Sequence, residues 1–245
     1  MRSTIVIKVG TSTLLSRDEL PSDTFGLVAS SITELTATHD VLLVSSGAIG
    51  FGVRELGLEK RLPDLPTLQA LASIGQVGLM RQWGKAFGTQ PVGQVLVTTR
   101  ELEEPSSALM LAETFREMWR LGVVPVINEN DAITNEEIAF GDNDVLAARV
   151  AVGVGASTLV LLTDQDGVQA DFGTNHQRRL PTLDLTEADR HVVDTKSEHG
   201  TGGIASKLLA GSLARQHGID CFIAYARQPD AVRQALAGES GTRLV

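Results

Sequence analysis

The stretch that decides the fold is Val123-Val-Pro-Val-Ile-Asn-Glu-Asn-Asp131, followed after a short polar segment by Phe140-Gly-Asp-Asn-Asp144. Its first part is an apolar, mostly β-branched run, which predicts a short strand buried in a parallel sheet that is covered on both faces. The run ends in Asn128-Glu-Asn-Asp131, at the carboxyl end of the expected strand. Ligands of open α/β sheets bind at that edge, so this strand end is a candidate site.

The second part of the stretch predicts a helix start. Gly141 permits a tight turn, and Asp142-Asn-Asp144 precedes the apolar run from Val145 to Ala148. Polar side chains in that position cap a helix by accepting hydrogen bonds from its first N–H groups. One such acid is most often only a cap or a solvated loop residue. Two polar clusters flanking one strand–loop–helix unit indicate a site.

Size and composition exclude several classes of protein. The chain has 245 residues, of which 42% are hydrophobic, enough for one large or two small α/β domains. Its net charge of -9 argues against a nucleic-acid partner. No stretch approaches the roughly 20 apolar residues of a membrane span, and Lys8 follows too soon for a signal peptide. The single cysteine, Cys221, is expected to be a buried thiol in a cytoplasmic protein.

The rest of the chain alternates between strand and helix patterns. Strands are expected at 4–9, 41–44, 91–98, 123–127, 158–162 and 219–224. Helices are expected at 22–38, 65–87, 106–121, 145–152, 208–216 and 229–236. Segment 170–199 has no clear pattern. This alternation favours the α/β class, a three-layer α/β/α sandwich with an open, mainly parallel sheet and helices on both faces.

Two of the helices carry more specific expectations. Gly75 and Gly78 imply that the helix over 65–87 packs closely against a neighbour or bends. The helix over 106–121 is expected to bury one apolar stripe. The stripe consists of Leu109, Ala112, Phe115, Met118 and Trp119.

The first strand carries a lysine, Lys8, inside an apolar run. An interior lysine is costly unless it meets an anion, whereas a lysine on an edge strand needs no partner. Gly10-Thr-Ser-Thr13 follows the strand, and such a turn either presents N–H groups to a phosphate or is an ordinary turn. A similar glycine- and hydroxyl-bearing segment, Ser45 to Gly52, follows the second strand.

A third glycine-rich segment, Gly200-Thr-Gly-Gly203, precedes Lys207 and a helical run. A helix start can hold phosphate oxygens, and Lys207 adds a point charge, so these pieces together suit a polyphosphate. The P-loop motif and the Gly-rich loop of protein kinases are absent from the sequence. The absence of Gly-x-Gly-x-x-Gly after the first strand weakens a dehydrogenase interpretation.

Six of these motifs stand in the order found in the amino-acid kinase family, which the chain resembles over nearly its whole length. They are Ile7-Lys-Val-Gly-Thr-Ser12, Val44-Ser-Ser-Gly-Ala-Ile49, Val124-Pro-Val-Ile-Asn-Glu-Asn-Asp131, Gly141-Asp-Asn-Asp144, Leu162-Thr-Asp-Gln165 and Gly200-Thr-Gly-Gly-Ile-Ala-Ser-Lys207. The resemblance implies one domain over 1–245, with a substrate-binding part over about 1–155 and a nucleotide-binding part over about 156–245.

The resemblance is strongest to the branch of the family that phosphorylates glutamate. It implies ATP- and Mg²⁺-dependent phosphorylation of the γ-carboxylate of L-glutamate to L-glutamyl 5-phosphate, the first step of proline biosynthesis. It also implies feedback inhibition by proline and a homo-oligomer, either a dimer or a tetramer. We expect no nucleic-acid or membrane partner.

Site residues follow from the same resemblance. It implies that Lys8 and Lys207 contact the phosphates and that Asp144 holds both lysines. The residues implied to bind glutamate are Ser46, Gly47, Asp131 and Asn143. The residues implied to bind the nucleotide are Lys8, Gly10, Thr163, Asp164, Thr201, Gly202, Gly203, Ile204, Ala205, Ser206 and Lys207. No residue is expected to be a metal ligand, and Asp131 suits the free α-ammonium of an amino acid.

The sequence departs from the family pattern in three places. The RNA-binding PUA domain that follows the kinase domain in many members is expected to be absent. Gly167-Val-Gln-Ala-Asp-Phe172 replaces the usual Gly-Leu-Tyr…Asp-Pro, and Leu111 stands where a polar residue is expected. Alternatives within the fold are acetylglutamate, aspartate, carbamate and uridylate kinases. A non-catalytic amino-acid sensor is disfavoured by the retained Lys8, Lys207 and Asp144.

Overall fold

The computed structural model describes residues 2–15, 23–59, 64–134, 143–171, 173–190 and 203–245. Its strands are β1 (Thr4–Val9), β2 (Asp40–Ser45), β3 (Val92–Val97), β4 (Val124–Glu129), β5 (Thr158–Thr163), β6 (Gln169–Ala170), β7 (Arg178–Arg179), β8 (Thr182–Leu183), β9 (Asp220–Tyr225) and β10 (Thr242–Leu244). Eight of them form one sheet in the order β3-β4-β2-β1-β5-β9-β10-β8. From β3 to β9 all neighbours are parallel, and β10 is antiparallel to β9.

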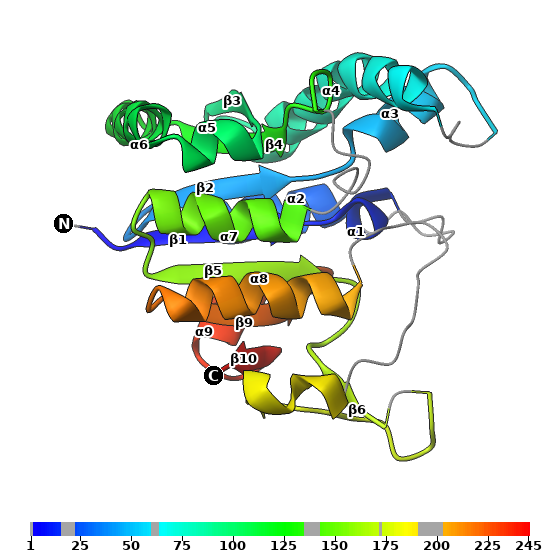
Figure 1. The fold of residues 1–245 in the computed structure, drawn as a ribbon, viewed down its shortest axis with the longest axis vertical. Coiled ribbons are helices and arrows are strands. Elements are labelled where there is room, and N and C mark those ends of the chain that lie inside the picture. The colour runs from blue at the N-terminus through cyan, green and yellow to red at the C-terminus, as the bar shows by residue number, and fades with distance from the viewer. Residues whose placement is uncertain (1, 16–22, 60–63, 135–142, 172, 191–202) are drawn as a thin grey trace.

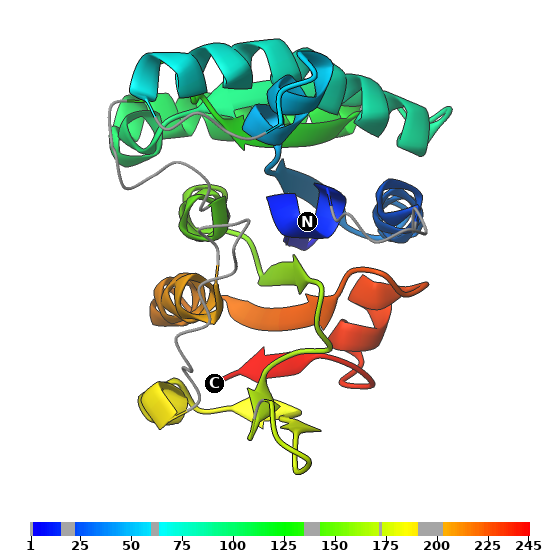
Figure 2. The same cartoon turned by 90° about the vertical axis from the view of Figure 1, so that its right-hand side faces the viewer.

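Helices cover both faces of this sheet (Figures 1 and 2). They are α1 (Thr11–Leu15), α2 (Thr24–Leu35), α3 (Ala48–Glu55), α4 (Leu65–Phe87), α5 (Thr99–Glu103), α6 (Pro105–Arg120), α7 (Asn143–Gly153), α8 (Ile204–Gln216) and α9 (Ala231–Leu236), with a 3-10 helix, η1 (Leu185–Arg190). One apolar cluster joins the sheet to α6, α7 and α8, and another joins it to α2, α4 and α9. The predicted three-layer α/β/α fold is confirmed.

Strand β1 lies in the middle of the sheet, between β2 and β5. Ile5, Ile7 and Val9 point to the α2–α4 face, whereas Val6 belongs to the opposite core. Side chains alternate along a strand, so Lys8 lies on the face that α7 and α8 cover. Because β1 is central, the alternative of an edge-strand lysine is wrong.

β1 is the topological switch point of the sheet, because later strands are added on both of its sides. The chain runs from β1 to β2 on one side and, by way of α7, later reaches β5 on the other side. Such a switch point leaves a crevice at the carboxyl ends of the strands, where ligands of α/β proteins bind. Those ends lie on the right of Figure 1 and face the viewer in Figure 2.

Several local expectations needed correction. Leu109 is 57% exposed, while Leu111 packs against the core. At about 100° per residue, Leu109 lies about 120° around the helix from the buried Phe115, so α6 buries a stripe displaced from the expected one. The short helices α1, α3 and α5 and the strand β10 were not expected. α7 already begins at Asn143 and α8 at Ile204, so their polar residues lie inside the first turns.

Two other expectations, the close packing at Gly75 and the buried thiol of Cys221, are confirmed. A Cβ atom added to Gly75 would lie 1.9 Å from the backbone oxygen of Ala48, which shows how closely α4 packs on α3. Cys221 is a buried free thiol whose pKa is raised to about 12, mainly by burial. In the part of the chain that the structure describes, no helix combines the length and the apolar character needed to cross a bilayer.

Candidate active site

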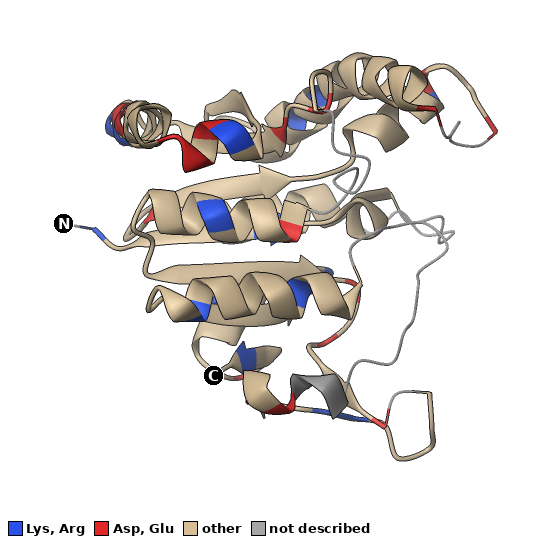
Figure 3. Cartoon of the chain, in the orientation of Figure 1, with Lys and Arg blue, Asp and Glu red and all other residues tan. Residues whose placement is uncertain are grey.

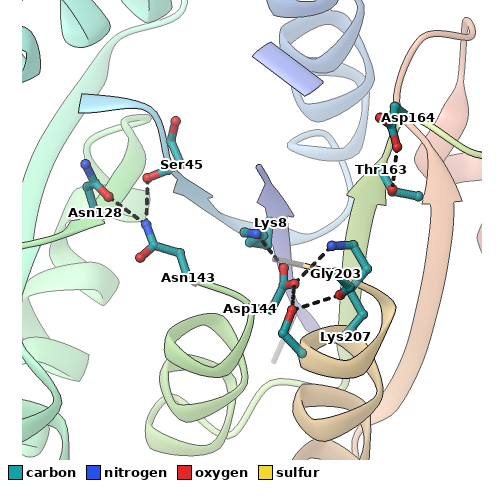
Figure 4. A network of polar contacts seen from close by, with 10 residues as sticks. Lys8, Ser45, Asn128, Asn143, Asp144, Thr163, Asp164, Gly203 and Lys207 are labelled. Carbon is teal, nitrogen blue, oxygen red and sulfur yellow. Dashed lines mark hydrogen bonds and ion pairs between the residues drawn. The ribbon is translucent and has the colours of Figure 1, made fainter. Parts of the chain in front are cut away.

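A buried ionic triad lies at the carboxyl end of β1 (Figure 4). The Nζ atom of Lys8 lies 2.5 Å from Oδ1 of Asp144, and the Nζ atom of Lys207 lies 3.0 Å from Oδ2 of the same carboxylate. Lys8 is 1% exposed, Asp144 0% and Lys207 7%. Residues from β1, α7 and α8, which are far apart in the sequence, thus share one charged cluster.

The fold explains why these three side chains meet. Lys8 lies on the face of the sheet that α7 and α8 cover, and these two helices pack side by side on that face (Figure 1). Asp144 lies in the first turn of α7, and Lys207 lies in the first turn of α8. In Figure 3 an acidic residue marks the right-hand end of α7, and a basic residue lies near the right-hand end of α8. Both helices begin at the carboxyl edge of the sheet, so their first turns flank the end of β1.

The carboxylate of Asp144 stays ionised in this buried position. Burial alone raises its pKa, but the ammonium groups of Lys8 and Lys207, aided by a hydrogen bond from Ser206, hold the pKa below its ordinary range. The Ser206 hydroxyl lies 2.7 Å from Oδ2. The triad itself contains two positive charges and one negative charge, an arrangement that suits an approaching anion.

A second, uncharged cluster adjoins the triad through the neighbouring residue Asn143. Its Nδ2 donates to Oδ1 of Asn128 at 2.6 Å and to the backbone oxygen of Ser45 at 3.1 Å. Ser46 is buried, and its hydroxyl has no hydrogen-bond partner among the described residues. Gly47 has φ of 115°, a left-handed conformation that favours glycine, and it begins α3.

Among the expected nucleotide residues, Thr163, Asp164 and Gly203 lie on the other side of the triad from Asn143 in Figure 4. A Cβ atom at Gly10 would lie 3.4 Å from Nζ of Lys8, so the backbone approaches the amine closely there. Gly203 caps α8, and Ile204, Ala205 and Ser206 form its first turn. Thr163 is the last residue of β5 and Asp164 follows it, and the Thr163 hydroxyl donates to Oδ1 of Asp164 at 3.2 Å. Thr201 and Gly202 lie outside the described residues.

Three predicted residues lie outside the hydrogen bonds and ion pairs described above for the two clusters. Asp131 is half-buried in the turn that follows β4, two residues beyond the end of that strand. Thr163 and Asp164 lie apart from the triad in Figure 4.

Two polar residues of the site were missed by the sequence analysis. Gln76 and Trp83 lie on the buried face of α4. Oε1 of Gln76 accepts from Nδ2 of Asn128 at 2.8 Å, and Nε1 of Trp83 donates to the Ser45 hydroxyl at 2.9 Å. The available signal was a glutamine in an apolar stripe, one position after Gly75, because buried amides need hydrogen-bond partners.

Comparisons with known proteins agree with this geometry. The model of the amino acid kinase family matches residues 3–225. With an α/β sandwich, a charged triad at the switch point and this match, the chain belongs to the amino acid kinase family.

Curated relatives within the family share the name Glutamate 5-kinase. One from Gloeobacter violaceus is 41% identical over 98% of this chain and 68% of the relative. One from Thermus thermophilus is 41% identical over 96% of this chain and 65% of its own length. One from Symbiobacterium thermophilum is 38% identical over 96% of this chain and 92% of its own length. The chain therefore spans about two thirds of the first two relatives and nearly all of the third.

Solved structures extend the likeness of the fold. Carbamate kinase from Giardia lamblia, bound to AMP-PNP, superposes with a TM-score of 0.70 at 18% identity, over 100% of this chain and 98% of the other. UMP kinase from Ureaplasma parvum gives a TM-score of 0.62 at 15% identity, over 100% of this chain and 99% of the other. At these identities the likeness concerns the fold alone.

Proposed function

We propose that this protein transfers the γ-phosphoryl group of ATP to the γ-carboxylate of L-glutamate, giving L-glutamyl 5-phosphate, the first step of proline biosynthesis. The observation that carries the proposal is the buried triad of Lys8, Asp144 and Lys207 at the switch point of the sheet. The choice of glutamate is supported by curated relatives named Glutamate 5-kinase at about 40% identity over nearly the whole chain.

The chemistry needs charge more than it needs a base. A carboxylate acceptor is already ionised near neutral pH, so no side chain has to remove a proton from it. Catalysis then consists of positioning the two substrates and stabilising the negative charge of the transferring group. Lys8 and Lys207 supply that charge as catalytic residues. Asp144 is a positioning residue because it fixes both ammonium groups before the substrates arrive.

The site suits a magnesium ion that binds together with the nucleotide and is held mainly by its phosphates. Both oxygens of Asp144 are engaged by the lysines, so this carboxylate is poorly suited to hold a metal. Within the described residues, no three His, Cys, Asp or Glu side chains form a group that could hold one. Mg²⁺ is commonly held largely by substrate phosphates, where it neutralises charge during transfer.

The two sides of the triad divide the work of binding. On the acceptor side we propose Ser46, Gly47, Asp131 and Asn143 as glutamate ligands. On the nucleotide side we propose Gly10, Thr163, Asp164 and residues 201–207. The corresponding halves of one domain are about 1–155 and 156–245. Inhibition by proline, assembly into a dimer or tetramer and a cytoplasmic location belong to the same proposal.

Trapping of the product with hydroxylamine tests the proposal. The protein is incubated with ATP, Mg²⁺ and hydroxylamine, together with glutamate, N-acetylglutamate or aspartate in separate reactions. An acyl phosphate is converted to a hydroxamate, and we expect hydroxamate and ADP with glutamate. Turnover with N-acetylglutamate or aspartate alone would contradict the assignment of glutamate as the substrate. No turnover with any of the three would contradict the proposed kinase activity.

A further inference from the structure

The amide cluster on the acceptor side has a fixed hydrogen-bond polarity. The backbone N–H of Glu129 donates to Oδ1 of Asn128 at 2.9 Å, and a backbone N–H can only donate. Oδ1 of Asn128 is therefore the acceptor, and its Nδ2 must be the donor. The orientation of one buried amide follows from the main chain of β4.

This orientation determines the amide of Asn143. Its Nδ2 donates to Oδ1 of Asn128 and to the backbone oxygen of Ser45, so both of its hydrogens are used. The oxygen of the Asn143 amide is then the group available to a ligand, since no described residue donates to it. An amide oxygen accepts hydrogen bonds, so at this position the site presents an acceptor to a donor.

The third amide belongs to Gln76, and we call the hydrogen-bonded series of Asn143, Asn128 and Gln76 the relay. Nδ2 of Asn128 donates to Oε1 of Gln76 at 2.8 Å, which makes Gln76 the acceptor at the end of the chain. Gln76 is 8% exposed, and its Nε2 has no hydrogen-bond partner among the described residues. A leucine or methionine at this position would have no unsatisfied donor of its own, but it would leave Nδ2 of Asn128 without its acceptor. The Gln76 amide therefore satisfies and orients Asn128, while its own Nε2 stays without a partner among the described residues.

We infer that Gln76 is a positioning residue that acts through Asn128 to hold the Asn143 amide with its oxygen toward the acceptor substrate. Together with the carboxylate of Asp131, that oxygen offers the substrate's ammonium group a second acceptor. The relay thereby selects an amino acid with a free α-amino group over its N-acylated form, which lacks the charge and has fewer N–H donors. This inference rests on the proposed function, because it concerns the acceptor site of the same reaction.

The test compares three single substitutions in α4. Gln76→Met keeps the volume of the side chain and removes its acceptor. Gln76→Glu keeps an acceptor oxygen whether its carboxyl is ionised or protonated. Gln82→Met makes the same chemical change at an exposed position of the same helix. Steady-state kinetics give KM for glutamate, KM for ATP and kcat, and thermal unfolding gives Tm for each variant.

We expect Gln76→Met to raise KM for glutamate about tenfold, the factor that corresponds to one lost hydrogen bond, with much smaller changes in KM for ATP. Gln76→Glu should recover most of this loss, and Gln82→Met should behave as the unaltered protein. An unchanged KM for glutamate in Gln76→Met would overturn the inference. So would equal losses in the methionine and glutamate variants, or a parallel change in both KM values, because these indicate packing alone.

A second arm keeps the inference testable if Gln76→Met does not fold. Asn128→Asp presents only acceptors, and the Gln76 amide can turn over to donate its Nε2 to the new carboxylate. We therefore expect Asn128→Asp to be tolerated when Gln76 is present and to lose glutamate affinity when combined with Gln76→Glu. Additive effects of the two changes would contradict the relay. Failure of the proposed function is separate, because then the unaltered protein forms no hydroxamate from glutamate.

Discussion

The two clusters around Asn143 and Asp144 differ in charge: one consists of ionised side chains and the other of neutral polar groups. On one side, Lys8, Asp144 and Lys207 form a triad of full charges. On the other, Ser45, Asn128 and their neighbours form a network of neutral amides and main-chain groups. Charges stabilise a group whose own charge changes during reaction, whereas directional neutral groups select a substrate by its donors and acceptors. Under the proposed function, adjacent residues on one helix turn serve catalysis and recognition.

The comparison is most strongly tested by Asp144→Asn. This change leaves two buried ammonium groups without their carboxylate, so we expect the free energy of unfolding to fall by about 3–5 kcal/mol. Urea denaturation followed by circular dichroism measures the change. Glu103→Gln is the control, because Glu103 of α5 forms an exposed ion pair with Arg149, which lies on α7 like Asp144. Loss of this pair should lower the free energy of unfolding by at most about 1 kcal/mol. Equal effects in the two variants would mean that the triad is not buried.

The pH dependence of stability shows whether the charge of Asp144, and not only its packing, stabilises the fold. The pKa of Asp144 is lowered in the folded protein. Its contribution to stability is therefore complete above the unfolded value of about 3.9 and is lost as pH falls from there toward the folded pKa. The stability difference between the unaltered protein and Asp144→Asn should stay constant from about pH 7 to pH 5 and shrink below about pH 4. A difference that grows on acidification would contradict the sign of the shift.

Removal of one lysine separates turnover from binding. Lys8→Met keeps the apolar stem inside β1 and removes the ammonium group, so we expect kcat to fall about a hundredfold or more. KM for glutamate should change little, in contrast to the variants of Gln76. Arg149→Ala, which removes a cation from the solvent side of α7, serves as the control and should retain normal kcat. Near-normal turnover in Lys8→Met would remove Lys8 from the mechanism.

The sequence was most informative where a residue was costly in its surroundings. Lys8 interrupts an apolar strand, and the energetic penalty of an unpaired interior lysine indicated either an anionic partner or an edge strand. The abrupt change from apolar to polar residues after Ile127 placed a site at a strand end. Both inferences used local physics and the general architecture of α/β proteins, which periodicity had already indicated.

The missed features depend on tertiary contacts. Helix α3 is poor in strong helix formers and reads as a glycine-rich turn, yet Gly52 allows it to pack against the backbone of Leu71. The role of Gln76 is visible only when α4 is placed over β4, since nothing in its own helix pairs with it. The buried stripe of α6 includes Leu111 and leaves Leu109 exposed, and which side of the helix faces the core is visible only from its packing on the sheet.

The smallest expected effect concerns the support of the amide cluster. Gly75→Ala places a Cβ atom 1.9 Å from the backbone oxygen of Ala48, so α4 must shift away from α3, at a cost of about 1–3 kcal/mol. Gly84→Ala changes the same helix where nothing lies within 4 Å of the new atom and should stabilise it by about 0.5–1 kcal/mol. Because Gln76 follows Gly75 directly, KM for glutamate should rise in Gly75→Ala while kcat stays near normal. If kcat fell and this KM did not change, the two clusters would not divide catalysis and recognition between them.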